Sequence, residues 1–209
     1  ALYAADLNPE VTPDALKLEA GKPATIRGAL GDALGYLNAV TKGAIVACAA
    51  DLAESTSVSP VSKAFAKGWF HAKNNPLSRL ISVGGICEDA MGGVMSGVSS
   101  LGLHIGVSSS YSAFIAALEH VPARLHAIGQ QMRHEATGEP YRAWIMVNAH
   151  AGPLTGEDGP THACPQPLQL LQDNFPKGSL ITLTPWDPSE VWPLLMAGLR
   201  ARPAVIAPF

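Results

Sequence analysis

Short strand-like runs recur along this chain, several of them apolar throughout, and segments with helical periodicity separate them. Continuous apolar runs are typical of strands buried on both faces, because a half-buried strand would alternate apolar and polar residues. The runs occupy residues 44–50, 80–84, 104–110, 142–149, 179–185 and 203–209. Strands that alternate with helices predict a three-layer α/β/α fold with a mostly parallel sheet of about six strands.

The segments between these runs predict helices. They cover residues 25–42, 88–102, 112–135 with an interruption at Pro122, 165–174 and 187–202. Asp187 is expected as an N-cap, with Pro188 at the first helical position. No sustained period precedes residue 25. We therefore expect residues 1–24 to form a leading segment and residues 25–209 to form a single domain.

The charge of the chain narrows its possible partners. The net charge of its 209 residues is −3, and only 15% of them are charged. Nucleic acid requires a basic footprint, and a membrane helix requires an apolar run of about 18 residues. Neither is found, so we expect no nucleic acid and no membrane as a partner. The low charge also favours apolar surface beyond the core of one monomer, either as an oligomer interface or as a face that has lost its neighbouring domain.

The three cysteines, Cys48, Cys87 and Cys164, lie far apart and form no C-x-x-C pair. This spacing supports neither a disulfide framework nor a zinc site. We expect a reducing compartment and hence a cytoplasmic location.

Four clusters of polar residues follow predicted strands, at residues 50–57, 84–93, 108–114 and 148–162. The carboxyl ends of parallel strands share one edge of a sheet, where ligands bind in such folds. We therefore expect the four clusters to converge on one site.

The residues in these clusters allow more than one interpretation. Glu88 is either a first-turn acid favoured by the helix dipole or a buried carboxyl that shares a proton with a ligand. His150, Asp158 and His162 are either metal ligands or parts of a polar turn. A metal site needs three or four assembled ligands, so we assign none to this chain. The serine-hydrolase motif G-x-S-x-G and the phosphate-loop motif are missing from the sequence.

Four motifs, in chain order, resemble the pyrimidine-binding domain of the transketolase family from about Thr25 onward. They are ADLAES (50–55), CEDAMG (87–92), GEDGPTH (156–162) and TPWDPSEVW (184–192). The resemblance implies a thiamine-diphosphate-binding fold. It also implies an enzyme that transfers a two-carbon ketol unit between sugar phosphates.

The resemblance assigns cofactor contacts to four residues. Glu88 occupies the position of the family's glutamate, which contacts the aminopyrimidine ring and is catalytic. Tyr111 and Phe114 occupy positions of aromatic residues around that ring, and Asp51 lies near the cofactor in its motif.

The resemblance also assigns substrate contacts. His150, Asp158 and His162 fall where the family holds the sugar hydroxyls and the reacting carbonyl, and both histidines are expected to be catalytic. Arg27 and Ser55 fall where it binds the sugar phosphate, for which a guanidinium is well suited.

Some family residues are replaced in this sequence. Cys87, Ala163 and Ala117 stand where the family has an arginine, a glutamine and a third aromatic residue. The G-D-G motif for the diphosphate is missing, and the nearest match is Gly-Asp-Ala at residues 31–33. We therefore expect another domain, on the same or a partner chain of a homodimer, to supply the diphosphate site with Mg²⁺ or Ca²⁺.

Three interpretations of the whole chain follow. The first is the central domain of a transketolase-like enzyme, as an excised piece or a separate subunit, inactive alone. The second is a non-catalytic dimerisation or assembly module that keeps the fold. The third is the matching domain of a deoxyxylulose-phosphate synthase or a 2-oxoacid dehydrogenase. The two histidines around GEDGPTH favour the first over the third.

Overall fold

Six parallel strands form one sheet in the order β2-β1-β3-β4-β6-β5. The computed structural model describes residues 2–5, 8–118, 123–152, 159 and 161–209. The strands are β1 (Ile45–Ala49), β2 (Leu80–Ile81), β3 (Ile105–Tyr111), β4 (Trp144–Ala149), β5 (Leu180–Leu183) and β6 (Val205–Pro208). The predicted parallel six-stranded sheet is confirmed.

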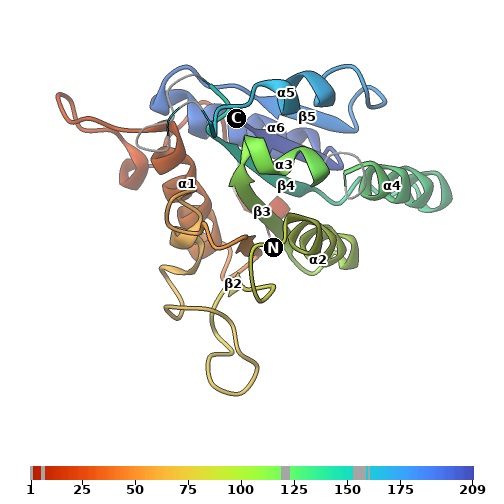
Figure 1. Ribbon diagram of the computed structural model, residues 1–209, viewed down its shortest axis with the longest axis horizontal. Helices are drawn as coiled ribbons and strands as arrows, with labels where there is room; N and C mark the ends of the chain where they lie inside the picture. Colours follow the sequence, from red (N-terminus) through yellow and green to blue (C-terminus); the bar gives the residue numbers. More distant parts are fainter. Residues whose placement is uncertain (1, 6–7, 119–122, 153–158, 160) are drawn as a thin grey trace.

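Helices cover both faces of the sheet (Figure 1). The α-helices are α1 (Ile26–Val40), α2 (Glu88–Leu101), α3 (Ser112–Leu118), α4 (Arg124–Thr137), α5 (Gln166–Leu171) and α6 (Val191–Ala201). Short 3-10 helices are η1 (Leu2–Ala4), η2 (Asp14–Leu16), η3 (Ser59–Ser62) and η6 (Pro188–Glu190). The predicted three-layer α/β/α architecture is therefore confirmed.

Alternation along the strands divides the core in two. Ile45 and Ala47 of β1 pack with α1 and α6, whereas Val46 and Cys48 pack with the layer formed by α2, α3, α4 and α5. Every residue of β1, β3, β4 and β6 is buried, as expected for strands covered on both faces. None of the helices among the described residues is long and apolar enough to cross a membrane.

A glycine in β3 sets how closely α2 approaches the sheet. A Cβ atom built on Gly106 would lie 2.1 Å from the carbonyl oxygen of Met95 in α2. The Gly106 amide also donates to the Ser99 hydroxyl of α2 at 2.8 Å. Because α2 begins at Glu88, this contact helps to determine where that carboxyl lies.

Several predicted elements change in extent. The helix expected at 112–135 is two helices, α3 and α4, and Pro122 lies outside the described residues. β2 has two residues where five were predicted, since this edge strand is paired only through Leu80 and Ile81. The predicted cap at Asp187 is confirmed: its carboxylate accepts from the Ser189 amide at 2.9 Å in a capping box with Glu190.

The leading segment packs onto the domain. The indole N–H of Trp192 in α6 donates to the carbonyl oxygens of Asn8 and Val11 at 3.2 and 3.0 Å. Leu2 is buried in the core cluster shared by α1 and α6.

Candidate functional site

The site lies at the carboxyl edge of β1, β3 and β4. The chain runs from β1 to the outer strand β2 and returns to β3 on the other side of β1, so the strand order reverses there. Such a reversal opens a crevice for ligands in parallel sheets. Tyr111 ends β3 opposite Ala149 of β4, and His150 follows Ala149 directly. The register therefore places Tyr111 and His150 next to each other.

Four rings form what we call the ring cluster: Tyr111, Phe114, His150 and His162. The His150 ring stacks on Tyr111, with centroids 4.1 Å apart and planes 13° apart. The His162 ring stands edge-on to Tyr111 and Phe114, with centroid distances of 5.6 and 5.5 Å. Tyr111 is 6% exposed and Phe114 is 43% exposed, so the cluster presents aromatic surface to a ligand.

Glu88 begins α2 beside this cluster. The hydroxyl of Ser110, the residue before Tyr111, donates to Glu88 Oε1 at 3.1 Å. Ser110 is fully buried, whereas Glu88 is half-buried. The structure therefore brings Glu88 to the same sheet edge as the two imidazoles, with less enclosure of the carboxyl than the sequence interpretation required.

Arg27, at the start of α1, reaches across to His150. Its Nη1 lies 3.2 Å from His150 Nε2 and donates to the carbonyl oxygen of Ser55 at 2.8 Å. The His150 backbone has φ of 59°, in the left-handed region, and its carbonyl accepts from the Cys164 amide at 3.3 Å. Arg27, Ser55 and His150 thus meet, although 123 residues separate Arg27 from His150.

Among the described residues, no hydrogen bond or ring contact joins the predicted Asp51 to the ring cluster. Asp51 is exposed in a turn with φ of 61°, and no hydrogen bond links its side chain to another described residue. Asp158 lies outside the described residues. The Ser55 hydroxyl donates to the Leu52 carbonyl at 3.3 Å, so the Ser55 backbone, and not its side chain, contacts Arg27.

The three positions at which the sequence departs from the family resemblance lie at Cys87, Ala163 and Ala117. Cys87 is exposed and precedes α2 without a side-chain cap. Ala163 is partly exposed next to His162, and Ala117 lies within α3.

One residue of the site, Ser110, was not predicted from the sequence. It stands within the predicted cluster at 108–114, but three consecutive serines gave no signal for which would face Glu88. Side chains of a strand alternate between the two faces of the sheet, so Ser108 and Ser110 of β3 lie on one face and Ser109 on the other. The Ser108 hydroxyl accepts from the Trp144 indole, which shows which face that is.

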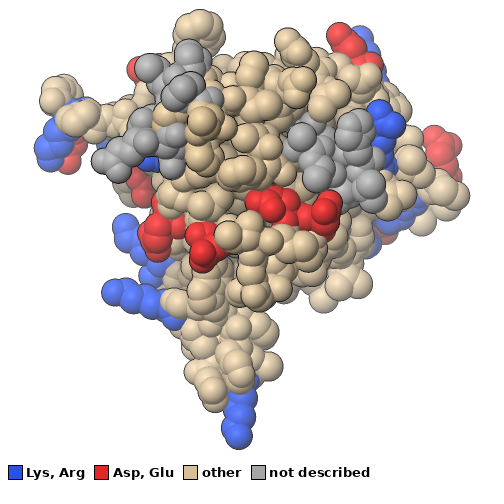
Figure 2. Space-filling view, viewed as in Figure 1, with Lys and Arg blue, Asp and Glu red and all other residues tan. Residues whose placement is uncertain are grey.

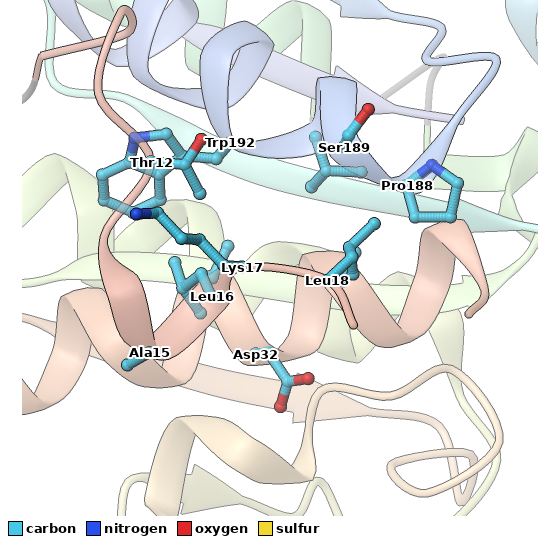
Figure 3. Close-up of a pocket in the computed structure, with 12 residues that line it drawn as sticks. Thr12, Ala15, Leu16, Lys17, Leu18, Asp32, Pro188, Ser189 and Trp192 are labelled. Carbon is cyan, nitrogen blue, oxygen red and sulfur yellow. The ribbon is translucent and has the colours of Figure 1, made fainter. Parts of the chain in front are cut away.

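No group of three potential metal ligands occurs among the described residues. A groove of about 410 Å³ lies elsewhere, between the leading segment, α1 and η6 (Figure 3). Thr12, Leu18, Asp32 and Trp192 help to line it, and it includes none of the predicted site residues. Figure 2 shows Asp and Glu side chains in a band across the middle of the visible face.

Comparisons with known proteins agree on the fold. A family model described as transketolase, pyrimidine binding domain, matches residues 22–207. A transketolase from Leishmania mexicana superposes with a TM-score of 0.71 at 22% identity, over 99% of this chain and 28% of that chain. None of the curated proteins matches the chain.

A second solved structure is a split gene transketolase, an inactive beta4 tetramer. It superposes with a TM-score of 0.56 at 21% identity, over 89% of this chain and 50% of that chain. This chain therefore spans half or less of the length of either structure. At sequence identities of 21–22%, the similarity to these two structures shows a shared fold and nothing further.

Proposed function

Because this chain belongs to the transketolase family through its pyrimidine-binding domain, we propose that it supplies the pyrimidine half of a thiamine-diphosphate site. The complete enzyme would transfer a two-carbon ketol unit between sugar phosphates. The observation that carries the proposal is the ring cluster beside Glu88, since a flat ring and a carboxyl are what an aminopyrimidine requires.

The described residues fit that ring. Phe114 offers an exposed aromatic face next to the buried Tyr111. The Glu88 carboxyl accepts from Ser110 through Oε1, and no described residue forms a hydrogen bond with Oε2. Oε2 is thus the oxygen proposed to share a proton with the pyrimidine. Bound thiamine diphosphate supplies a carbon nucleophile and an electron sink, which side chains do not offer.

The two imidazoles are proposed to face the substrate. His150 stacks on Tyr111 and His162 stands edge-on to it, so both imidazoles belong to the cluster that would hold the pyrimidine. Such groups can hold hydroxyls and the reacting carbonyl. Arg27 and Ser55 are proposed near the sugar phosphate, Asp158 near a hydroxyl and Asp51 near the cofactor.

The other half of the cofactor site is proposed to come from a diphosphate-binding domain. Glu88 and Asp89 place two carboxyl groups in the first turn of α2, which disfavours phosphate groups there unless a cation or a partner neutralises them. Large apolar side chains on α2 and α4 are exposed and suited to packing against such a domain. They are Val94, Leu101, Leu125, Ile128 and Met132.

Two titrations of this chain test the proposal, one with thiamine and one with thiamine diphosphate plus Mg²⁺. Calorimetry and NMR measure the binding in each. A half-site contacts only the ring, so both ligands should bind with similar Kd values of about 1 mM, equivalent to about −4 kcal/mol. Phe114 and Tyr111 signals should move. Diphosphate binding in the micromolar range would contradict a half-site, and unmoved ring signals would contradict the pyrimidine assignment.

Glu88→Gln provides the specific test, with Asp89→Asn as the matched control. Asp89 is the exposed next residue of the same first helical turn. Glu88→Gln should weaken thiamine binding and remove most ketol transfer in the assembled enzyme, whereas Asp89→Asn should change neither. A non-catalytic assembly module, the alternative, would bind the partner domain and tolerate both changes.

A further inference from the structure

The ring of His150 is held from three directions. Its backbone adopts a left-handed conformation, which is unfavourable for a non-glycine residue and persists where the surroundings impose it. Its imidazole stacks on Tyr111, and Nε2 lies 3.2 Å from Arg27 Nη1. The ring plane and the direction of Nε2 are therefore set before any ligand binds.

Arg27, as the neighbour of Nε2, favours one position of the imidazole proton. A guanidinium carries N–H donors only and keeps its charge at all ordinary pH values. A hydrogen bond to it requires a lone pair on Nε2, so the proton of the neutral ring is on Nδ1. A proton on Nε2 would place two N–H groups against each other beside a full positive charge.

The second bond of Arg27 keeps the guanidinium in place. Nη1 also donates to the Ser55 carbonyl at 2.8 Å, so the segment after β1 anchors the donor that faces His150. This contact involves the backbone of residue 55 and is independent of its side chain.

We propose that Arg27 is a positioning residue that holds His150 as a neutral imidazole with its proton on Nδ1. In this state the single lone pair of Nε2 accepts from Arg27, and it becomes available to the O–H of a ligand only when Arg27 turns to another partner. The release of this acceptor to a sugar hydroxyl, as Arg27 turns to the sugar phosphate, rests on the proposed function. The tautomer itself is a property of the unliganded chain.

The test is long-range ¹H–¹⁵N NMR of the unliganded chain with labelled histidine at neutral pH. His150→Gln identifies the His150 signals. Wild type should show Nδ1 protonated and Nε2 unprotonated, the reverse of the tautomer preferred by a histidine in water. A doubly protonated His150 ring in the wild-type chain, or a neutral ring with its proton on Nε2, would by itself overturn the proposal.

Arg27→Met removes the donor, and Arg27→Lys keeps a cationic donor of similar length. Arg27 is exposed, so neither change disturbs the core. Arg27→Met should shift the tautomer ratio at least about tenfold toward Nε2–H, because bonds to charged donors are strong. Arg27→Lys should restore much of the wild-type ratio, and Arg124→Met, at an exposed arginine of α4, should leave it unchanged. An unchanged ratio in Arg27→Met would refute the role of Arg27.

Discussion

Gly106→Ala should destabilise the chain because β3 and α2 are too close at this point for a side chain. The new Cβ would lie 2.1 Å from the Met95 carbonyl oxygen and 2.8 Å from its carbon. These are backbone atoms that cannot rotate away, so α2 has to move outward by about 1 Å to restore ordinary contact.

The magnitude has two parts. Overpacking in a core costs about 1–3 kcal/mol. The outward movement also weakens the 2.8 Å bond from the Gly106 amide to the Ser99 hydroxyl, which adds about 1 kcal/mol. The gain from removing a flexible glycine offsets part of this. We expect a net loss of about 1–3 kcal/mol, or a melting temperature lower by about 2–12 °C.

Gly97→Ala is the matched control. Gly97 is exposed on α2, and a Cβ there would meet nothing within 4 Å. The same substitution should therefore stabilise the chain by about 0.5–1 kcal/mol. Urea unfolding followed by circular dichroism measures both. A Gly106→Ala variant as stable as wild type would show that α2 does not pack on β3 as described.

Three further outcomes are expected. Asn38→Leu should lower the free energy of unfolding in urea by about 3 kcal/mol, because the buried amide donates to the Ile45 and Val61 carbonyls and accepts from the Ile45 amide. A loss below about 1 kcal/mol would contradict this. Burial lowers the pKa of His126 below 6.5 in the folded chain. As pH falls, the unfolded chain therefore binds this proton before the folded chain does, and the free energy of unfolding should decrease below about pH 6.5. His126→Gln should reduce that slope, and an unchanged slope would exclude His126 as its cause. Burial raises the pKa of Cys48 to about 11. Thiol reagents at neutral pH should therefore label the exposed Cys87 and leave Cys48 unmodified, which mass spectrometry of the native chain measures.

The secondary structure was largely predictable, with particular exceptions. The continuous apolar run at 44–50 predicted the buried β1, which spans Ile45–Ala49. The strand expected at 80–84 keeps only Leu80 and Ile81, since pairing at a sheet edge depends on one neighbour alone. The helix expected at 165–174 ends at Leu171, because Gln172 adopts an extended conformation that periodicity does not reveal.

The site was predictable where strand order determines position. Tyr111 and His150 follow neighbouring strands of a parallel sheet, so their motifs were expected to meet, and their rings stack. The bond between Arg27 and His150 was not predicted. It depends on where the first turn of α1 lies relative to the residue that follows β4, which no local pattern records.

The sequence alone determined the succession of strands and helices, the family motifs and the edge at which they gather. These are properties of contiguous residues, because periodicity and turn chemistry act over a few positions. Only the tertiary structure decided that Ser110 donates to Glu88, that Gly106 sets the height of α2 and that Arg27 faces an imidazole nitrogen. Each of these depends on packing between segments far apart in the chain, where shifts of about 1 Å decide whether a hydrogen bond forms.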